Sequence, residues 1–505
     1  MECKNSFSKA IKISKIDIFI TSNMNKNKIP DLTTYNICTD SRAIEPGCLF
    51  FAIKGKEQNG ELFIEEALKK KAAFIVVEKD HKPKFLKCRY IFVKNIRSFL
   101  SKLATLKYRN NVPNIVAVTG TNGKTSVAHF FKELCTLTGF KTASIGTLGL
   151  QGAKVQEVQN YLSNHTTPPP LELHQLLKKL SESSYTHVAL EASSHGLAQH
   201  RIDNLKIKAA AFTNITQDHL DYHGNLETYF LAKAKLFSEI LKNGASAIIN
   251  TDSYYGKRLI EICKRRSINL LDFGIQAKAF RIISLSERKV ALFNKIYVLD
   301  IKLQGDFQFY NILAAMGLAY SCGISLEILT GELKHLSAPI GRLEHVGNFN
   351  GGSVYIDYAH TPDSLKKILQ TLRKTCKNKL HILFGCGGDR DRGKRPVMGK
   401  IANQLADSVY VTDDNPRGEQ AFAIRKEILQ FCSKGIDVGN RSVGINFAVT
   451  RMNPGDVLVI AGKGHENYQI IDGTYNFFSD HTEVQKTING LRKGLRLQIN
   501  TEQDL

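Results

Sequence analysis

Long apolar runs are missing from this sequence of 505 residues. No run approaches the ~18 apolar residues that a membrane-spanning helix needs, although 43% of the residues are hydrophobic. Residues 1–14 contain lysines but no continuous apolar segment followed by a small-residue cleavage site, so no signal peptide is expected. These absences argue against a membrane-inserted or secreted protein.

Paired cysteines are also missing. The ten cysteines are scattered, and none forms a Cys-x-x-Cys pair. Scattered thiols of this kind are typical of a reducing compartment. We therefore expect a cytoplasmic protein.

Acidic residues are scarce relative to basic ones, with 47 Asp and Glu against 69 Lys and Arg, a formal net charge of +22. One interpretation is a nucleic-acid or membrane-surface partner. The other is a lysine-rich surface around a pocket for anionic substrates. The basic residues are spread along the whole chain without the basic-aromatic interleaving that stacks bases. We favour the second interpretation and expect no nucleic-acid partner and no membrane insertion.

The chain is too long for one hydrophobic core and divides into about three domains. Apolar runs that alternate with helical patterns predict an α/β fold with parallel, doubly wound sheets. The expected domains are a small N-terminal α/β domain (1–110), a central P-loop ATPase domain (111–338) and a C-terminal Rossmann-like domain (339–505). The apolar runs lie at residues 48–53, 72–77, 90–93, 115–118, 186–190, 209–212, 245–249, 354–356, 380–384, 408–411 and 457–460.

A glycine-rich turn follows the run at residues 115–118. Only Thr121 and Asn122 separate Gly120 from Gly123, and Lys124, Thr125 and Ser126 open a helical pattern. Backbone N–H groups of such a turn bind phosphate, the lysine reaches the terminal phosphates, and the threonine hydroxyl can hold Mg²⁺. The alternative is an ordinary turn between strand and helix, and the strand before it and the helix after it favour a phosphate loop.

Polar residues follow four strands of the third segment. In open α/β sheets, ligands bind beyond the carboxyl ends of the strands. Solvated turns would explain one such end, but four together favour a binding site. The four strand ends are residues 357–363, 385–392, 412–417 and 461–466.

Together these motifs resemble the Mur ligase family of ATP-dependent amide-forming enzymes, over nearly the whole chain. The resemblance is carried by the glycine-rich loop and by residues 39–42, 166–168, 191–195, 218–221, 341–342, 357–360, 385–395 and 414–417. It implies a cytoplasmic ligase of peptidoglycan precursor synthesis. The enzyme would add meso-2,6-diaminopimelate to UDP-MurNAc-L-Ala-D-Glu through an acyl phosphate.

The resemblance also implies ATP and Mg²⁺. ATP would contact Gly120, Thr121, Asn122, Gly123, Lys124, Thr125, Ser126, Asn311 and Arg342. Thr125, Glu191 and His219 match metal positions, and Lys233 matches a lysine carried as a carbamate, which would bind a second Mg²⁺. Lys124, His219 and Lys233 are the expected catalytic residues. As alternatives, Glu191 is a helix-capping carboxylate, His219 a turn residue and Lys233 a plain surface lysine.

Two further sets of residues match substrate positions of the family. The nucleotide sugar and its dipeptide would contact Thr39, Ser41, Lys56, Glu57, Gln58, His165, Thr166, Thr167, Ser193, Gln199 and Arg201. Diaminopimelate would contact Arg390, Asp414, Asn415, Pro416, Arg417, Gly462 and Glu466. A guanidinium pairs with a carboxylate through two hydrogen bonds, so Arg417 would recognise the distal carboxylate that lysine lacks.

Other functions stay open at this level. Within the family, the enzyme could add L-lysine or, more remotely, act as a folylpolyglutamate-type ligase. Outside it, the charge of +22 suggests a nucleic-acid-dependent P-loop ATPase. The run Ser193-Ser194-His195 lacks the Gly-x-Ser-x-Gly elbow of a serine hydrolase. We expect a monomer.

Overall fold

The structure, a computed structural model, describes residues 19–20, 30–55, 58–83, 85, 89–152 and 165–503. Lys56, Glu57 and residues 1–14 lie outside this part of the chain. The chain divides into two compact units. The first comprises Met1–Val112, Lys154–Tyr185 and His195–Lys206, and the second comprises Pro113–Ala153, Thr186–Ser194 and Ile207–Leu505.

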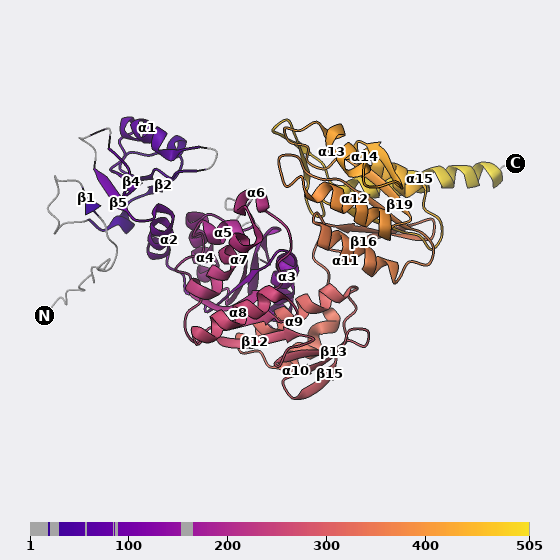
Figure 1. The fold of residues 1–505 in the computed structure, drawn as a ribbon, viewed down its shortest axis with the longest axis horizontal. Helices are drawn as coiled ribbons and strands as arrows, with labels where there is room; N and C mark the ends of the chain where they lie inside the picture. The colour runs from indigo at the N-terminus through magenta and orange to yellow at the C-terminus, as the bar shows by residue number, and fades with distance from the viewer. Residues whose placement is uncertain are drawn as a thin grey trace. The chain divides into compact units, whose positions relative to one another are not determined.

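A five-stranded sheet of order β1-β5-β4-β3-β2 forms the centre of the first unit (Figure 1). Its strands are parallel except β1. Side chains alternate along each strand, so α1 packs on one face and α2 on the other. The elements are β1 (Phe19–Ile20), η1 (Leu32–Thr34), β2 (Ile37–Cys38), η2 (Ser41–Ala43), β3 (Leu49–Phe51), η3 (Gly60–Phe63), α1 (Ile64–Lys69), β4 (Phe74–Glu78), β5 (Tyr90–Val93), α2 (Ile96–Lys107) and α4 (Pro170–Glu182). A further helix, α5 (Ser194–Ala198), begins at the junction of the two units.

The second unit contains a ten-stranded sheet of order β15-β14-β13-β12-β11-β10-β6-β9-β7-β8. Helices α3 and α9 pack against it around one apolar core. Its strands are β6 (Asn114–Thr119), β7 (Thr142–Gly146), β8 (Gly149–Gln151), β9 (His187–Glu191), β10 (Ile207–Phe212), β11 (Ser246–Asn250), β12 (Asn269–Gly274), β13 (Phe280–Ser284), β14 (Lys289–Leu292) and β15 (Lys295–Val298). Its helices are α3 (Lys124–Leu137), α6 (Leu220–His223), α7 (Leu226–Lys235), the π-helix η6 (Leu236–Ile240), α8 (Tyr254–Arg265), α9 (Asp306–Ser321), α10 (Leu326–Glu332) and η7 (Leu333–His335).

The sheet is parallel at its centre, as predicted, but not at its edges. The pairs β13–β14, β14–β15 and β7–β8 are antiparallel. The apolar runs did not predict the strands between residues 269 and 298. Strand β13 buries alternate residues only, so it has no continuous apolar run that would mark a strand covered on both faces.

A six-stranded sheet of order β16-β17-β21-β18-β19-β20 forms the rest of the second unit. All its pairs are parallel except β16–β17. Helices α11, α12 and α13 cover one face, and α14 and α15 cover the other (Figure 1). The elements are β16 (Glu344–Phe349), β17 (Gly352–Asp357), α11 (Pro362–Arg373), β18 (Leu380–Phe384), α12 (Lys394–Leu405), β19 (Ser408–Thr412), α13 (Ala421–Leu429), β20 (Gly435–Gly439), α14 (Arg441–Thr450), β21 (Val457–Ala461), the hairpin strands β22 (Tyr468–Ile471) and β23 (Thr474–Phe477), and α15 (Asp480–Gln503).

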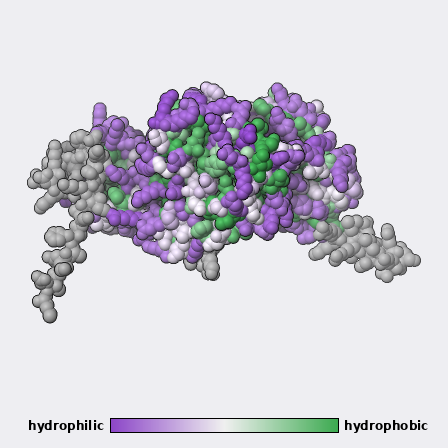
Figure 2. Space-filling model, turned by 90° about the horizontal axis from the view of Figure 1, so that it is seen from below, coloured by the Kyte–Doolittle hydropathy of each residue, from purple (hydrophilic) through white to green (hydrophobic). Residues whose placement is uncertain are grey.

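The surface is mainly polar on the face that Figure 2 shows, where smaller apolar areas lie between hydrophilic ones. Among the residues whose structure is described, no helix combines the length and apolar character needed to cross a membrane.

A buried ion pair fastens α15 to the six-stranded sheet. Arg441, at the start of α14, donates from Nε and Nη2 to the carboxylate of Asp480 at 2.7 and 2.8 Å. Its Nη2 also donates to the carbonyl of Ala461, at the end of β21, at 2.9 Å. Both charged side chains are fully buried. The pair therefore joins two helices to one strand end.

We predict that Asp480→Ala destabilises the protein by about 3–5 kcal/mol, because it leaves a buried guanidinium without its counter-charge. Lys486→Ala is the control, since Lys486 pairs with Glu483 on the solvent side of α15 and exposed pairs contribute roughly 0–1 kcal/mol. Urea unfolding followed by far-ultraviolet circular dichroism suits a chain without tryptophan. Equal midpoints for the two variants would contradict this role.

Candidate functional site

The glycine-rich turn forms a tight loop between β6 and α3. Gly120 and Gly123 have φ values of 151° and 90°. A Cβ atom on Gly120 would lie 1.9 Å from Oγ1 of Thr213, and one on Gly123 would lie 2.4 Å from Oδ1 of Asn311. Both positions therefore require glycine, and the loop leads into the N-terminus of α3, where an anion is favoured.

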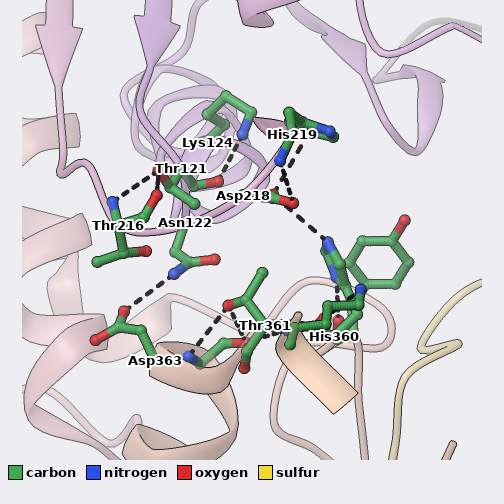
Figure 3. Close-up of polar contacts among 12 residues, drawn as sticks. Thr121, Asn122, Lys124, Thr216, Asp218, His219, His360, Thr361 and Asp363 are labelled. Carbon is green, nitrogen blue, oxygen red and sulfur yellow. Dashed lines mark hydrogen bonds and ion pairs between the residues drawn. The ribbon is translucent and has the colours of Figure 1, made fainter. Parts of the chain in front are cut away.

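Neighbouring strand ends hold the loop in place. The side chain of Asn214 accepts from the N–H of Asn122 at 3.0 Å, and Thr213 donates to the carbonyl of Asn122 at 2.6 Å. Thr121 accepts from the N–H of Thr216 at 3.0 Å (Figure 3). The loop is therefore supported from the end of β10, the next strand of the sheet.

Lys124 lies over this loop. Its Nζ donates to the carbonyls of Gly120 and Thr121 at 2.9 and 2.8 Å (Figure 3). Burial lowers the pKa of Lys124, and the carboxylates of Glu191 and Asp218 oppose that effect. An ammonium in this position can neutralise phosphate charge.

Lys233 reaches the same carbonyl from α7. Its Nζ donates to Gly120 at 2.8 Å and lies 4.5 Å from the ring centre of Tyr229. Burial, with the nearby charge of Lys124, lowers the pKa of Lys233 well below its ordinary value. Because the side chain is 1% exposed, the alternative of a plain surface lysine is wrong.

The predicted metal ligands Thr125 and Glu191 are neighbours. The Thr125 hydroxyl donates to Oε2 of Glu191 at 3.0 Å and accepts from Nη2 of Arg342 at 3.1 Å. Thr147 donates to both Glu191 oxygens, from its N–H at 2.9 Å and from its hydroxyl at 3.0 Å. Glu191 does not cap a helix through these contacts, because two of its partners are side-chain hydroxyls and the third, the N–H of Thr147, lies between β7 and β8.

These oxygen donors suit Mg²⁺. Magnesium keeps several waters and is usually bound by one or two carboxylates together with substrate phosphates. No group of three or more His, Cys, Asp or Glu in metal-binding arrangement occurs in the described ranges. A magnesium ion that also binds the phosphates of a nucleotide does not require such a group.

His219 and Asp218 lie beside the loop at the start of α6. His219 has a left-handed backbone, with φ of 54°. Its Nε2 is 3.5 Å from Oδ2 of Asp218, and burial lowers its pKa to about 4. Nε2 of His360, which follows β17, is 3.9 Å from the same oxygen (Figure 3). Burial favours the neutral, protonated form of Asp218, but His219 and His360 hold its pKa below the ordinary value.

A cavity of about 900 Å³ lies between the phosphate loop, the end of β17 and helix α11. Its volume is typical of a small-molecule site. Nδ2 of Asn122 donates to Oδ2 of Asp363 at 3.0 Å across one side (Figure 3). Five of the predicted nucleotide contacts line the cavity, namely Asn122, Gly123, Ser126, Asn311 and Arg342.

The predicted diaminopimelate residues come from three strand ends of the six-stranded sheet. Nδ2 of Asn415 donates to Oε2 of Glu466 at 3.0 Å. A Cβ atom on Gly462 would lie 2.7 Å from Oδ2 of Asp414, so this position has room only for glycine. Pro416 is buried in the same loop, whereas Arg390 is exposed.

Arg417 has a left-handed backbone, with φ of 54°. Its N–H donates to the carbonyl of Ile470 at 3.0 Å, and its carbonyl accepts from Asp472 at 2.7 Å, so β22 fixes its position. Its Nη1 donates to the carbonyl of Gly388 at 2.9 Å.

The predicted nucleotide-sugar residues are divided between the units. In the first unit, Arg201 donates to the carbonyl of Thr167 at 2.6 Å and to Oε1 of Gln199 at 2.8 Å, which brings these three together. His165 and Thr166 directly precede Thr167, Ser41 is buried at the start of η2, and Thr39 and Gln58 are exposed. Ser193 follows β9 in the second unit.

Thr147 and Thr213 were not predicted, and His360 and Lys463 lie in strand ends that were predicted to form a binding site but had no individual role, although the signal for all four exists. Thr147 follows β7, Thr213 follows β10, His360 follows β17 and Lys463 follows β21. The rule that ligands bind beyond strand ends identifies all four. Only the structure shows that Thr147 holds Glu191.

Three family models match successive parts of the chain. They are described as the Mur ligase family catalytic domain (residues 33–108), the Mur ligase middle domain (118–319) and the Mur ligase glutamate ligase domain (341–464).

Individual proteins are similar over nearly the whole length. UDP-N-acetylmuramoyl-L-alanyl-D-glutamate–2,6-diaminopimelate ligase from Bradyrhizobium diazoefficiens is 41% identical over 90% of this chain and 94% of its own. A solved structure of a protein with the same name is 31% identical, with a TM-score of 0.63, over 91% of this chain and 95% of its own. The MurF ligase of Thermotoga maritima, solved with ADP, shares the fold at 20% identity and a TM-score of 0.61, over 91% and 98% of the two chains.

The fold, the phosphate loop and these similarities agree. The chain belongs to the Mur ligase family of ATP-dependent ligases and has the three-domain α/β architecture of that family.

Proposed function

We propose that this enzyme joins meso-2,6-diaminopimelate to the D-Glu carboxylate of UDP-MurNAc-L-Ala-D-Glu and converts ATP to ADP and phosphate. The observation that supports it most is the convergence of the half-buried Lys124 and the buried Lys233 on the carbonyl of Gly120. The ammonium of Lys124 can neutralise phosphate charge at this loop, which favours an anionic ligand such as a triphosphate. The name of the Bradyrhizobium relative supplies the substrates.

The proposed reaction has two steps. The D-Glu carboxylate attacks the γ-phosphorus of ATP, and ADP leaves. The amine of the amino acid then attacks the acyl carbon, so the amide bond forms as phosphate leaves with loss of a proton from the amine. Lys124 compensates charge that develops on the transferred phosphoryl group. Asn311 would contact the adenine, and Arg342 would contact the phosphates.

Mg²⁺ would neutralise phosphate charge. Thr125, Glu191 and His219 would hold it, and Thr147 keeps Glu191 in place. Lys233 would carry a carbamate that adds a further oxygen ligand. The lowered pKa of Lys233 supports this modification, because the neutral amine is the form that reacts with CO₂.

The remaining predicted contacts keep the roles given by the family. Thr39, Ser41, Lys56, Glu57, Gln58, His165, Thr166, Thr167, Ser193, Gln199 and Arg201 would bind the nucleotide sugar and its dipeptide. Arg390, Asp414, Asn415, Pro416, Arg417, Gly462 and Glu466 would form the diaminopimelate site. We keep domain boundaries near residues 110 and 338, and we place a monomeric enzyme in the cytoplasm, where its proposed substrates are made.

The test of the function is phosphate release from ATP with UDP-MurNAc-L-Ala-D-Glu and a panel of amino acids. We expect release only with the dipeptide substrate and diaminopimelate together. Release that requires DNA or RNA instead would support the ATPase alternative that the charge of +22 suggests.

Lys124→Ala should fold but lose at least ~10²-fold in turnover. A well-placed donor to developing charge lowers the activation barrier by roughly 2.7–4 kcal/mol. Turnover of the variant with saturating substrates measures this loss. Near-normal turnover would refute the assignment of Lys124 to the transferred phosphate.

Lys233→Ala should be nearly inactive, and acetate or another short carboxylate should partly restore turnover by filling the vacated volume. Lys235→Ala is the matched control on α7 and should resemble the wild type, because it does not share the buried position of Lys233. Intact mass under CO₂ should show one added carboxylate on the wild type. An unmodified Lys233 in a fully active enzyme would remove the carbamate from this proposal.

The wild type should prefer meso-diaminopimelate over L-lysine strongly, and Arg417→Ala should lose the preference. A buried polar group left without its partner can give discrimination of ~10⁴-fold or more. The ratio of kcat/KM values for the two amino acids measures it. Equal use of L-lysine by the wild type would overturn this specificity and leave the ligase reaction intact.

A further inference from the structure

Lys463 is a buried lysine that no role above uses. It follows β21, its side chain is completely buried, and it lies among the predicted diaminopimelate residues. Its Nζ donates to Oδ1 of Asn415 at 3.0 Å and to Oε2 of Glu466 at 3.0 Å. A charged amine in such a place is expensive unless it is paired, and here it has two partners.

Lys463 occupies two acceptor oxygens, Oδ1 of Asn415 and Oε2 of Glu466. Oδ1 of Asn415 also accepts from the N–H of Ile470 at 3.0 Å, which fills its two lone pairs. Oε2 of Glu466 also accepts from Nδ2 of Asn415 at 3.0 Å. An amino-acid ammonium therefore finds no free acceptor at either of these oxygens.

Two other carboxylate oxygens are less engaged in hydrogen bonds with the described part of the chain. Oε1 of Glu466 has the Tyr358 hydroxyl at 3.5 Å, a long contact. Oδ1 of Asp414 accepts from the N–H of Asn415 at 2.6 Å, whereas its Oδ2 faces the position where Gly462 lacks a side chain. Asp414 and Glu466 thus each offer one oxygen to a ligand. Asn415 orients both carboxylates, because its N–H and its Nδ2 donate to them.

We propose that Lys463 is the positioning residue of the amino-acid site, an internal ammonium that locks Asn415 and Glu466 and keeps the pair of buried carboxylates ionised to receive the substrate ammonium. The proposal rests on the proposed function, because it assumes that this site takes an amino acid. With Lys463 in place, Asp414, Glu466 and Lys463 sum to one negative charge, which matches one substrate ammonium.

The electrostatics agree with this geometry. Burial raises the pKa of Glu466 above its ordinary value, Lys463 is the largest influence that opposes this rise, and Asp414 adds to it. Burial also raises the pKa of Asp414, but Lys463 and Arg441 together hold it below its ordinary value. Among the described residues, Glu466 also interacts with Tyr358 from the end of β17, Tyr468 on β22 and the guanidinium of Arg441 on α14.

Lys463→Met removes the charge and keeps most of the side-chain length. We expect kcat/KM for diaminopimelate to fall about 30-fold or more, as when one partner of a buried charge pair is removed, with KM for ATP unchanged. Glu466 should then bind its proton more tightly. Because only the carboxylate holds an ammonium, the acid limb of the kcat/KM profile should move to higher pH.

Lys463→Gln is a second variant for the case that the methionine variant does not fold. It keeps a hydrogen-bond donor near Asn415 and should show the same shift of the acid limb to higher pH. Lys486→Met is the control, a lysine three residues from its glutamate on an exposed helix face. An equal loss of kcat for all substrates, with KM for diaminopimelate and the acid limb unchanged, would overturn the proposal.

The proposed function and this inference fail in different ways. If the wild type releases no phosphate with diaminopimelate but does so with another amino acid, the substrate assignment is wrong and the same comparison is made with that amino acid. If no amino acid is used, carbon NMR of labelled glutamate, with Glu466 assigned by Glu466→Gln, measures the titration directly. An unchanged pKa of Glu466 in Lys463→Gln would overturn the role of Lys463.

Discussion

The carbonyl oxygen of Gly120 is the point on which the candidate site depends. Lys124, from the first turn of α3, and Lys233, from α7, both donate to it. Gly120 can place its carbonyl there only because it has no Cβ, which would lie 1.9 Å from Thr213. Two amines that are distant in sequence are therefore brought together by one backbone oxygen, and burial, with the repulsion from Lys124, lowers the pKa of Lys233. A carbamate on Lys233 would turn that repulsion into attraction, since it replaces one cation by an anion.

The strand ends of the two large sheets supply the rest of the site. The guanidinium of Arg342 donates to Thr125, a predicted metal ligand, and lies 4.4 Å from the ring centre of Tyr358, which follows β17. Asn122 reaches Asp363 at the start of α11. Asp218 faces His219 on one side and His360 on the other. The glycine-rich loop and the start of α3 therefore share polar contacts with the part of the chain that contains the six-stranded sheet.

Much of this arrangement could be predicted from the sequence. The four apolar runs of the third segment form β17, β18, β19 and β21, because strands covered on both faces read as continuous apolar stretches. Outer strands such as β13 were not predicted, since β13 buries alternate residues only. Individual side-chain contacts could not be predicted from the sequence either. That Lys233 is buried depends on how α7 packs against the loop, and that Thr147 holds Glu191 depends on strand order, and neither spacing nor composition encodes these facts.

Basic side chains also outnumber acidic ones around the glycine-rich loop. Lys124, Lys233 and Arg342 gather where Glu191 and Asp218 are the facing carboxylates. In the amino-acid site the balance is reversed, since Asp414 and Glu466 share one ammonium from Lys463. The first arrangement suits triphosphate and carboxylate, and the second suits an amine. Because buried charges are tolerated only when they are matched, each site favours a ligand of opposite charge before any specific contact forms.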